Sequence, residues 1–376
     1  MNMKSKKKIA VIGANQPLLS FFKRAVAYEE YEYHVFSWEE GAVCRTYAHK
    51  FYPISFKEKD IILDICKEIN IDGITSFSLE SALPTVNYIA QKLGLQGNSP
   101  ECGVLMDNKY TMRNALLDNS VAVPRFKSVS QADEVSSEFN YPLIIKPIDS
   151  GGSRGVTLVY DKNELANAIT IAIKFSQKNE VLVEEFIDGK EYSVEYLTDK
   201  SKHYFIAITE KETTQPPYFV ELAHHQPALL DALTLSKVKQ TVEKTLSVLK
   251  VAASPSHTEI KINSKGEIFV IETCSRLGGD FITSDLVYYS TGIDMVKAAI
   301  DLCANNYTYE PPAFNKFSGI YFLSLENKRI LNVFDHLPQH SEIVYSEKNE
   351  NELKNVTESN ERSGCLIYQS EKKMTY

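Results

Sequence analysis

The sequence lacks the features that mark several classes of protein. Its cysteines are scattered without a CxxC pair, at six positions: Cys44, Cys66, Cys102, Cys274, Cys303 and Cys365. This spacing argues against a disulfide framework or a zinc site and is expected of reduced thiols in a cytoplasmic protein. No apolar run reaches the roughly 20 residues that a membrane span requires. The run IAVIGA, after the N-terminal lysines, is too short for the apolar core of a signal peptide.

The sequence also lacks an excess of positive charge. Its formal net charge is −8 at pH 7, with 41 Lys and Arg against 49 Asp and Glu. A protein that binds the phosphate backbone of nucleic acid needs a broad basic face, so we expect no nucleic-acid partner. A local basic pocket for a nucleotide is still compatible with this charge. The chain has 376 residues, 43% of them hydrophobic, which suits two or three soluble domains.

Strand and helix signals alternate in residues 1–104, which predicts a parallel sheet with helices on its faces. The expected strands and helices are Lys8–Gly13, Leu18–Tyr28, Tyr33–Phe36, Asp60–Glu68, Gly73–Phe77 and Pro84–Lys92. Gly13 is the one glycine of a dinucleotide fingerprint here, so we interpret this segment as a Rossmann-like scaffold. A dinucleotide-dependent oxidoreductase is therefore disfavoured.

The rest of the chain mixes strands and helices in a different order. The expected helices are Asp107–Leu117, Glu164–Phe175, Leu235–Leu249 and Asp285–Ala304. From Glu310 onward, short apolar runs predict a small β-rich region: SGIYFLSL, RILNVF, SEIVYS and CLIYQS. The charge-rich segment Ser346–Arg362 is interpreted as a loop or a solvated surface.

Glu259 and Glu272 form the clearest candidate site. They lie on two expected strands, HTEIKI and EIFVIET, which the short turn Asn263–Gly266 joins. Two carboxylates that converge from neighbouring strands suit Mg²⁺, which prefers carboxylates together with substrate phosphates. The alternative is a solvated pair of acids. His257 is expected on the same face, where it would donate to a phosphate or orient a metal-bound water; a packed strand histidine is the competing interpretation.

Three other segments carry residues suited to a nucleotide. After the second glutamate, TCSRLGGD offers Arg276 as a clamp for a transferring phosphoryl group, followed by two glycines. Lys146 is expected at a strand end and is followed by the Gly/Ser loop DSGGSRG, whose backbone N–H groups suit phosphates, although no GK[ST] makes it a Walker A loop. In VLVEEFIDGKE, Phe186–Ile187 offers backbone groups to adenine, and Glu191 offers a carboxylate to ribose. Taken alone, each segment also fits an ordinary hairpin or junction.

These segments follow one order: the lysine with its Gly-rich hairpin, then EEFIxGxE, then the paired glutamates and RxGG. From Asn108 to Ala304 this joint pattern resembles the ATP-grasp superfamily. SHTEIKI, IETCSRLGGDFI and PPYFVELAHHQPALL are similar to the carboxylate–amine ligase branch that includes bacterial L-amino acid (dipeptide) ligases. The resemblance implies α/β and α+β architecture. A Rossmann-like pre-ATP-grasp domain (1–104) would precede an ATP-grasp domain (105–305, with a lid at about 123–199) and a β-rich C-terminal subdomain (306–376).

The resemblance implies a role for each candidate residue. The ATP-binding residues would be Lys109, Lys146, Ser150, Gly152, Ser153, Gly155, Glu184, Phe186, Ile187 and Glu191. Glu259 and Glu272 would bind Mg²⁺ or Mn²⁺. The remaining residues would act in catalysis (Arg276 and His257) or surround the substrate (Glu221, His224, Gly278 and Gly279).

One position departs from the family's pattern. Many ATP-grasp enzymes carry Asn two residues after the second glutamate, as a further metal ligand, and here that residue is Cys274. A thiol is a poor ligand for Mg²⁺, so one ion would bind more weakly or water would replace the ligand. The dipeptide-ligase branch is often small or neutral at this position, so activity is still expected.

The resemblance implies an ATP-dependent ligase that forms a carbon–nitrogen bond through an acyl phosphate. Two alternatives stay open from the sequence: a carboxylase-type ATP-grasp enzyme and a non-catalytic ATP-binding regulator. The expected partners are a small carboxylate and an amine, and amino acids are the first candidates for both. No membrane partner is expected. The sequence names neither substrate. It also leaves the oligomeric state open, with a homodimer as the assembly that the resemblance suggests.

Overall fold

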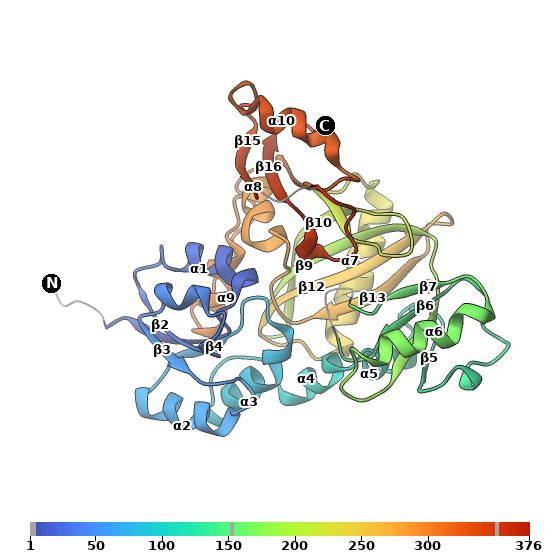
Figure 1. Cartoon of the computed structure of the whole chain (residues 1–376). Helices are drawn as coiled ribbons and strands as arrows, with labels where there is room; N and C mark the ends of the chain where they lie inside the picture. The colour runs from blue at the N-terminus through green and yellow to red at the C-terminus, as the bar shows by residue number, and fades with distance from the viewer. Residues whose placement is uncertain (1–4, 151–153, 350–352) are drawn as a thin grey trace.

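The computed structural model describes residues 5–150, 154–349 and 353–376. Its strands form three sheets, one of eight strands and two of four. In Figure 1 the N-terminal sheet lies at the lower left, the lid sheet at the lower right and the C-terminal strands at the top. No helix in these three ranges is long and apolar enough to cross a membrane.

The N-terminal sheet is parallel, as the alternating pattern predicted. Its order is β3-β2-β1-β4, with β1 (Lys7–Ile12), β2 (Tyr31–Ser37), β3 (Lys50–Pro53) and β4 (Gly73–Thr75). The connecting helices are α1 (Leu19–Ala25), α2 (Lys59–Ile69) and α3 (Leu83–Leu93). Asn70 and Gly94 end α2 and α3 in left-handed conformations, which Asn and Gly tolerate better than other residues. The edge strand β3 was not expected.

Two helices connect this domain to the rest of the chain. The sequence predicted one helix over Asp107–Leu117, but the structure has α4 (Pro100–Asp107) and α5 (Lys109–Asp118). Asn108 is extended between them, and its side-chain oxygen accepts hydrogen bonds from the backbone N–H groups of Tyr110 and Thr111. This N-cap fixes the start of α5 at Lys109.

The segment expected to form the lid contains a small antiparallel sheet of order β5-β8-β6-β7 with one helix packed on it, and this sheet and helix (126–185) are called the lid below. Residues 189–199, which were also expected in the lid, form β9 of the large sheet instead. Its strands are β5 (Phe126–Val129), β6 (Leu143–Pro147), β7 (Thr157–Val159) and β8 (Val181–Glu185). The helix α6 (Lys162–Ile173) buries Leu165, Ala168 and Ile169 against this sheet. The other face of β6 and β8 contributes Lys146 and Glu184 to a cavity.

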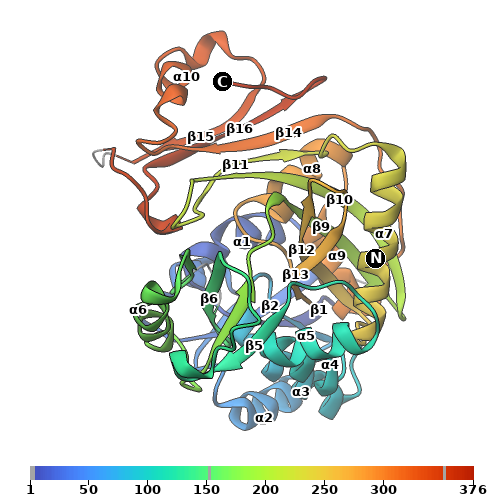
Figure 2. The same ribbon diagram turned by 90° about the vertical axis from the view of Figure 1, so that its right-hand side faces the viewer.

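The large sheet has the order β13-β12-β9-β10-β11-β14-β16-β15. Its strands are β9 (Gly189–Asp199), β10 (Lys202–Thr213), β11 (Glu221–Gln226), β12 (Ser254–Asn263), β13 (Ile268–Cys274), β14 (Phe317–Phe322), β15 (Ile343–Lys348) and β16 (Gly364–Ser370). The C-terminal strands continue this sheet, because β14 pairs with β11 (Figure 2). α7 (Ala232–Val248) packs Val238, Val242 and Leu246 against one face of it.

Two predicted elements differ in the structure. The single helix expected over Asp285–Ala304 is a π turn (Ile282–Leu286), then α8 (Val287–Thr291) and α9 (Met295–Cys303). Gly292 ends α8 with a φ of +79°, and the Asp294 side chain caps α9. The apolar run RILNVF is helical, not a strand: α10 (Leu331–Asp335) follows a short 3-10 turn. Its buried residues, Ile330 and Val333, are three apart, as a helix requires.

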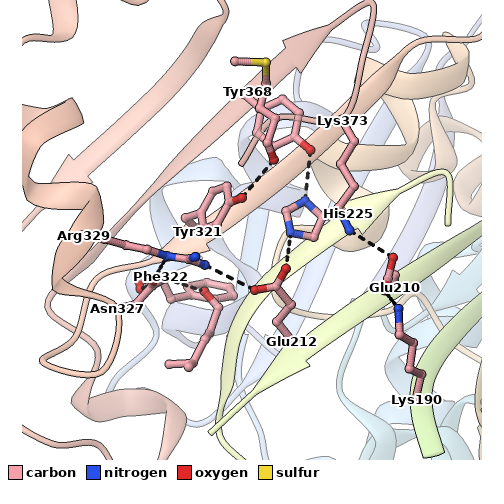
Figure 3. A network of polar contacts seen from close by, with 12 residues as sticks. Lys190, Glu210, Glu212, His225, Tyr321, Phe322, Asn327, Arg329, Tyr368 and Lys373 are labelled. Atoms are coloured by element: carbon pink, nitrogen blue, oxygen red, sulfur yellow. Dashed lines mark hydrogen bonds and ion pairs between the residues drawn. The ribbon is translucent and has the colours of Figure 1, made fainter. Parts of the chain in front are cut away.

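A polar network joins the C-terminal strands to β10 and β11 (Figure 3). The ring of His225 is fully buried, with Nε2 2.9 Å from a Glu212 oxygen and Nδ1 3.0 Å from the Tyr368 hydroxyl. Lys373 lies 3.0 Å from Glu210. Because side chains alternate along a strand, Glu210 and Glu212 point to one face of β10, and Lys211, which lies between them, points to the other face.

Candidate active site

A cavity of about 1160 Å³ lies where the four parts of the chain meet. The N-terminal domain contributes Glu80, the lid Lys146, the large sheet Glu259 and the C-terminal region Arg362. Fourteen of the predicted site residues line it: Lys109, Lys146, Ser150, Glu184, Phe186, Ile187, Glu191, Glu221, His224, His257, Glu259, Glu272, Arg276 and Gly279.

The other four predicted residues are glycines and a serine of the two loops. Gly152 and Ser153 lie outside the described residues. Gly155 has a φ of +72°, and a Cβ there would lie 2.7 Å from the ring of Phe175, so this glycine serves the packing of the lid. Gly278 packs against His257, whose Nδ1 would be 2.6 Å from an added Cβ. The absence of a side chain at Gly278 therefore leaves room for the His257 ring, which lines the cavity.

Glu259 and Glu272 face each other across β12 and β13, where they are direct partners in the strand register. Each carboxylate already has a lysine beside it. Lys109 Nζ lies 2.8 Å from Glu272, and it also donates to the carbonyl of Ser150 at 2.9 Å. The two acids are thus not a solvated hairpin pair, since each holds a cation inside the cavity.

Glu184 holds the lysine of the lid. Its two oxygens lie 2.7 Å from Lys146 Nζ and 2.9 Å from Arg113 Nη2, and all three side chains are buried. Burial alone would raise the pKa of the Glu184 carboxyl, but Arg113 and Lys146 hold that pKa below its usual value. Burial lowers the pKa of Lys146, and Glu184 opposes this shift. Arg113 was missed from the sequence because it lies within a helix, away from any motif.

Lys211 is the most important candidate site residue that the sequence analysis did not predict. Its side chain is 4% exposed, and its Nζ lies 2.8 Å from both Glu191 and Glu259 and 3.5 Å from Glu221. Burial opposes its charge, but these three carboxylates raise the pKa of Lys211 well above its usual value. A signal was available: Lys211 alternates with Glu210 and Glu212 in a strand, so it lies on the opposite face from both acids.

His257 lies on the cavity face of β12, as predicted. Its Nδ1 is 2.7 Å from Glu195, which is fully buried, and its Nε2 is 3.7 Å from Glu259. Burial opposes a charge on the imidazole, but Glu195 and Glu259 raise the pKa of His257 to about 9. The ring is therefore a cation held in place between two carboxylates.

Arg276 reaches toward the N-terminal domain. Its Nη2 lies 3.4 Å from Glu80, and its buried Nε has no hydrogen-bond partner in the part of the chain that the structure describes. Ligand atoms of Glu80, Glu272 and Cys274 all lie within 4.8 Å of one another. The carboxylates of Glu80 and Glu272 suit a hard divalent cation, with Glu259 opposite Glu272 in the strand register. Glu80 brings an oxygen beside the thiol that replaces the expected Asn.

An aromatic and cationic group lies at the lid end of the cavity. Phe186 and Phe219 have ring centroids 6.0 Å apart. Lys261 Nζ is 4.6 Å from the Phe186 ring centroid and donates to the Ile187 carbonyl at 3.3 Å. The Phe186 N–H donates to the Pro142 carbonyl within the lid, so it is less available to a ligand than the sequence suggested.

The opposite end of the cavity is formed with the C-terminal region. Arg362 pairs with Asp280 at 2.8 and 3.0 Å, and the Ser359 hydroxyl donates to Glu221 at 3.2 Å. The segment Ser346–Arg362 was predicted to be a solvated loop, which is wrong at its end, since the Arg362 side chain is 11% exposed. Burial lowers the pKa of His224, beside this group, to about 3, so its ring is neutral.

Comparison with known proteins shows which family and which structures this chain resembles. Residues 139–285 match the family of the ATP-grasp domain. The predicted resemblance to the ATP-grasp superfamily is therefore confirmed, and residues 139–285 are the part of the chain that carries the match.

Two curated relatives and two solved structures are among the proteins that this chain resembles. An uncharacterised protein, y4rH, of Sinorhizobium fredii (strain NBRC 101917 / NGR234) is 32% identical over 243 residues, which cover 63% of this chain and 49% of that protein. The alanine–anticapsin ligase of Bacillus subtilis (strain 168) is 24% identical over 272 residues, which cover 65% and 57%. The chain thus spans about half the length of these curated relatives.

The structure of an L-amino acid ligase from Bacillus licheniformis matches with a TM-score of 0.81 at 21% identity, covering 98% of this chain and 95% of that one. An N5-carboxyaminoimidazole synthetase from Staphylococcus aureus, complexed with ADP, matches with a TM-score of 0.78 at 17% identity, covering 98% and 95%. At such identities the likeness concerns the fold. The predicted ATP-grasp fold is confirmed.

Proposed function

We propose that this protein is an ATP-dependent carboxylate–amine ligase that forms an amide or peptide bond and releases ADP and phosphate. The observation that carries the proposal is the facing pair Glu259 and Glu272, which shares one cavity with Lys109, Lys211 and Arg276. Such a set of carboxylates and fixed cations suits phosphoryl transfer, where catalysis is mainly positioning and charge stabilisation. The ligase names of relatives, such as the alanine–anticapsin ligase, support amino acids as substrates.

The nucleotide would lie between the lid and the large sheet. Lys109 and Lys146 would bind its phosphates, and each lysine is already held by a glutamate, so little side-chain freedom is lost on binding. Phe186, Phe219 and Lys261 would surround the adenine, and Glu191 would accept from ribose hydroxyls. Glu259 and Glu272, with Glu80 beside them, would hold Mg²⁺, which when bound neutralises phosphate oxygens and polarises the transferring phosphorus.

The reaction would proceed in two steps. An oxygen of the substrate carboxylate attacks the γ-phosphorus, the bond from phosphorus to the bridging oxygen breaks, and ADP leaves. The amine then attacks the acyl carbon, phosphate leaves with its electron pair, and the nitrogen loses a proton. Arg276 would bind the transferred group, since it lines the cavity and its buried Nε has no hydrogen-bond partner among the described residues. His257, held by Glu195, would keep the Glu259 carboxylate in position.

The experiment that tests this proposal measures phosphate and ADP release from Mg-ATP with L-amino acids supplied singly and in pairs, followed by mass spectrometry of the products. We expect release that requires two amino acids and yields a dipeptide, and loss of that release in Arg276→Ala. ATP binding without release in any mixture would favour the non-catalytic regulator. Release that requires bicarbonate alone would favour the carboxylase-type reaction and contradict the proposal.

A further inference from the structure

The turn after Arg276 presents one acidic side chain to the cavity in a strained conformation. Asp280 and Phe281 both have positive φ angles, +47° and +63°. Two successive non-glycine residues in the left-handed region are costly and persist where the surroundings fix them. Asp280 is fixed by Arg362, a residue of the C-terminal region. The strain therefore accompanies a contact between two distant parts of the chain.

Arg362 is held on three sides. Its Nε donates to the Ser359 carbonyl at 2.7 Å, its two terminal nitrogens donate to the two oxygens of Asp280, and its guanidinium lies 3.7 Å from the ring centroid of Phe322. Stacking and a two-pronged ion pair are the contacts that orient a guanidinium best. The side chains of Arg362 and Asp280 are 11% and 33% exposed, so removing one partner of this partly buried pair leaves an uncompensated charge in the cavity.

Glu221 and His224 lie near this pair. Glu221 lies 3.5 Å from Lys211 and accepts from Ser359, and His224 is neutral with its Nδ1 unpartnered among the described residues. A substrate α-ammonium can therefore turn to Glu221. A charged substrate side chain that reached this pair would have to separate Asp280 from Arg362.

We propose that the Asp280–Arg362 pair sets the substrate class: this end of the cavity accepts an amino acid with an uncharged side chain and excludes acidic and basic ones. This inference rests on the proposed ligase function. An acidic side chain would compete with Asp280 for the guanidinium, and a basic one would compete with Arg362 for the carboxylate. The site then selects uncharged side chains because a charged one must break the Asp280–Arg362 ion pair in order to bind. Other sites likewise discriminate by making the wrong ligand unfavourable.

The test compares the full-length protein with Asp280→Asn, Arg362→Gln and the double variant. Three probes of similar length, L-methionine, L-glutamate and L-lysine, are each varied against a fixed pool of neutral L-amino acids, and kcat/KM is obtained from ADP release. Arg329→Gln is the matched control, because Arg329 also belongs to the C-terminal region and pairs with an acid, Glu212, outside the cavity (Figure 3). Thermal unfolding and ADP binding check that each variant folds; Asp280→Ser and Arg362→Met replace a variant that does not.

The two single variants should change selectivity in opposite directions. Asp280→Asn frees Arg362 and should raise kcat/KM for glutamate relative to methionine about tenfold, which is the scale of one charge-assisted hydrogen bond. Arg362→Gln frees Asp280 and should raise the lysine ratio instead. The double variant and Arg329→Gln should keep the preference for methionine.

Equal losses with all three probes would overturn the inference, because a merely structural pair would not alter the ratios. That result would leave the ligase function standing, since the wild-type protein would still turn over. A wild-type protein that releases no ADP with any amino acid would overturn the proposed function, and the inference with it.

Discussion

At the scale of single residues, the site is built from charges that neutralise one another before any ligand binds. Lys211 illustrates this, because it is nearly buried and lies within 3.5 Å of Glu191, Glu221 and Glu259. Lysines and glutamates are rarely buried without a partner, and the removal of one partner costs more than the pair contributes. Each lysine therefore places the carboxylates beside it and offsets their negative charge.

Replacing Lys211 with Met should lower the free energy of unfolding by about 3 kcal/mol, since three carboxylates would lose their shared cation. Urea denaturation measures this change. Lys190→Met is the matched control: Lys190 forms a 2.7 Å pair with Glu210 on the neighbouring strand, but it is 71% exposed. The control should change stability by less than about 1 kcal/mol. Equal effects of the two substitutions would show that burial does not decide the contribution of Lys211.

The two glycines after Arg276 should respond differently to a methyl group. In Gly278→Ala the new Cβ would lie 2.6 Å from His257 Nδ1 and displace the ring from Glu195, while at Gly279 the nearest atom is 3.7 Å away. We expect Gly278→Ala to cost about 1–3 kcal/mol of stability, as other overpacked sites do, and to lower turnover. Gly279→Ala should fold normally. Thermal unfolding and ADP release measure both effects, and a well-tolerated Gly278→Ala would contradict this role for Gly278.

At the scale of secondary structure, the start of α5 is the element that positions a phosphate-binding candidate. The break between α4 and α5 could not be read from apolar spacing, because both helices bury residues on a similar repeat. Asn108 was the available signal, since its side chain caps the next helix. The run RILNVF was wrongly predicted to be a strand for a related reason. Its β-branched and apolar residues favour a strand, but the burial of Ile330 and Val333 fits a helix.

Asn108→Ala should lower stability by about 1 kcal/mol, as the loss of an N-cap usually does, and should weaken ATP binding because Lys109 is the first residue of α5. Asp161→Ala removes the same kind of cap from α6 of the lid, where the side chain accepts from the Asn163 N–H. It should lower stability similarly with a smaller effect on ATP affinity. Isothermal titration with ATP distinguishes the two variants, and equal ATP affinities would contradict the positioning role of Asn108.

At the scale of the whole molecule, the cavity exists because four parts of the chain converge. The sequence motifs predicted the ATP-grasp fold and brought fourteen named residues to one site, since each motif carries its own chemistry. They did not predict Arg362 or Glu80, because a residue that reaches the site from another domain leaves no local pattern. They also missed Lys211, although its alternation with Glu210 and Glu212 was a usable signal. The C-terminal strands likewise read as a separate β-rich region, but β14 pairs with β11 and extends the large sheet.

The N-terminal parallel sheet and α1 share a core with α9. Phe21, Phe22 and Tyr33 belong to one buried cluster with Met295 and Ile300 of α9. We therefore expect residues 1–104 expressed alone to expose this apolar face, bind a hydrophobic dye and unfold without a cooperative transition. The full chain should unfold in one transition. Calorimetry and dye fluorescence measure these properties, and a cooperatively unfolding fragment would show that the domain is independent.

The central claim, that the protein joins a carboxylate to an amine through an acyl phosphate, is tested most directly by following the carboxylate oxygens. The accepted amino acid is prepared with ¹⁸O in its carboxylate and incubated with Mg-ATP and the second substrate, and the released phosphate is examined by mass spectrometry. The account predicts one ¹⁸O atom in each phosphate, because the attacking oxygen leaves with the phosphoryl group. Phosphate without ¹⁸O, formed together with the amide product, would contradict it.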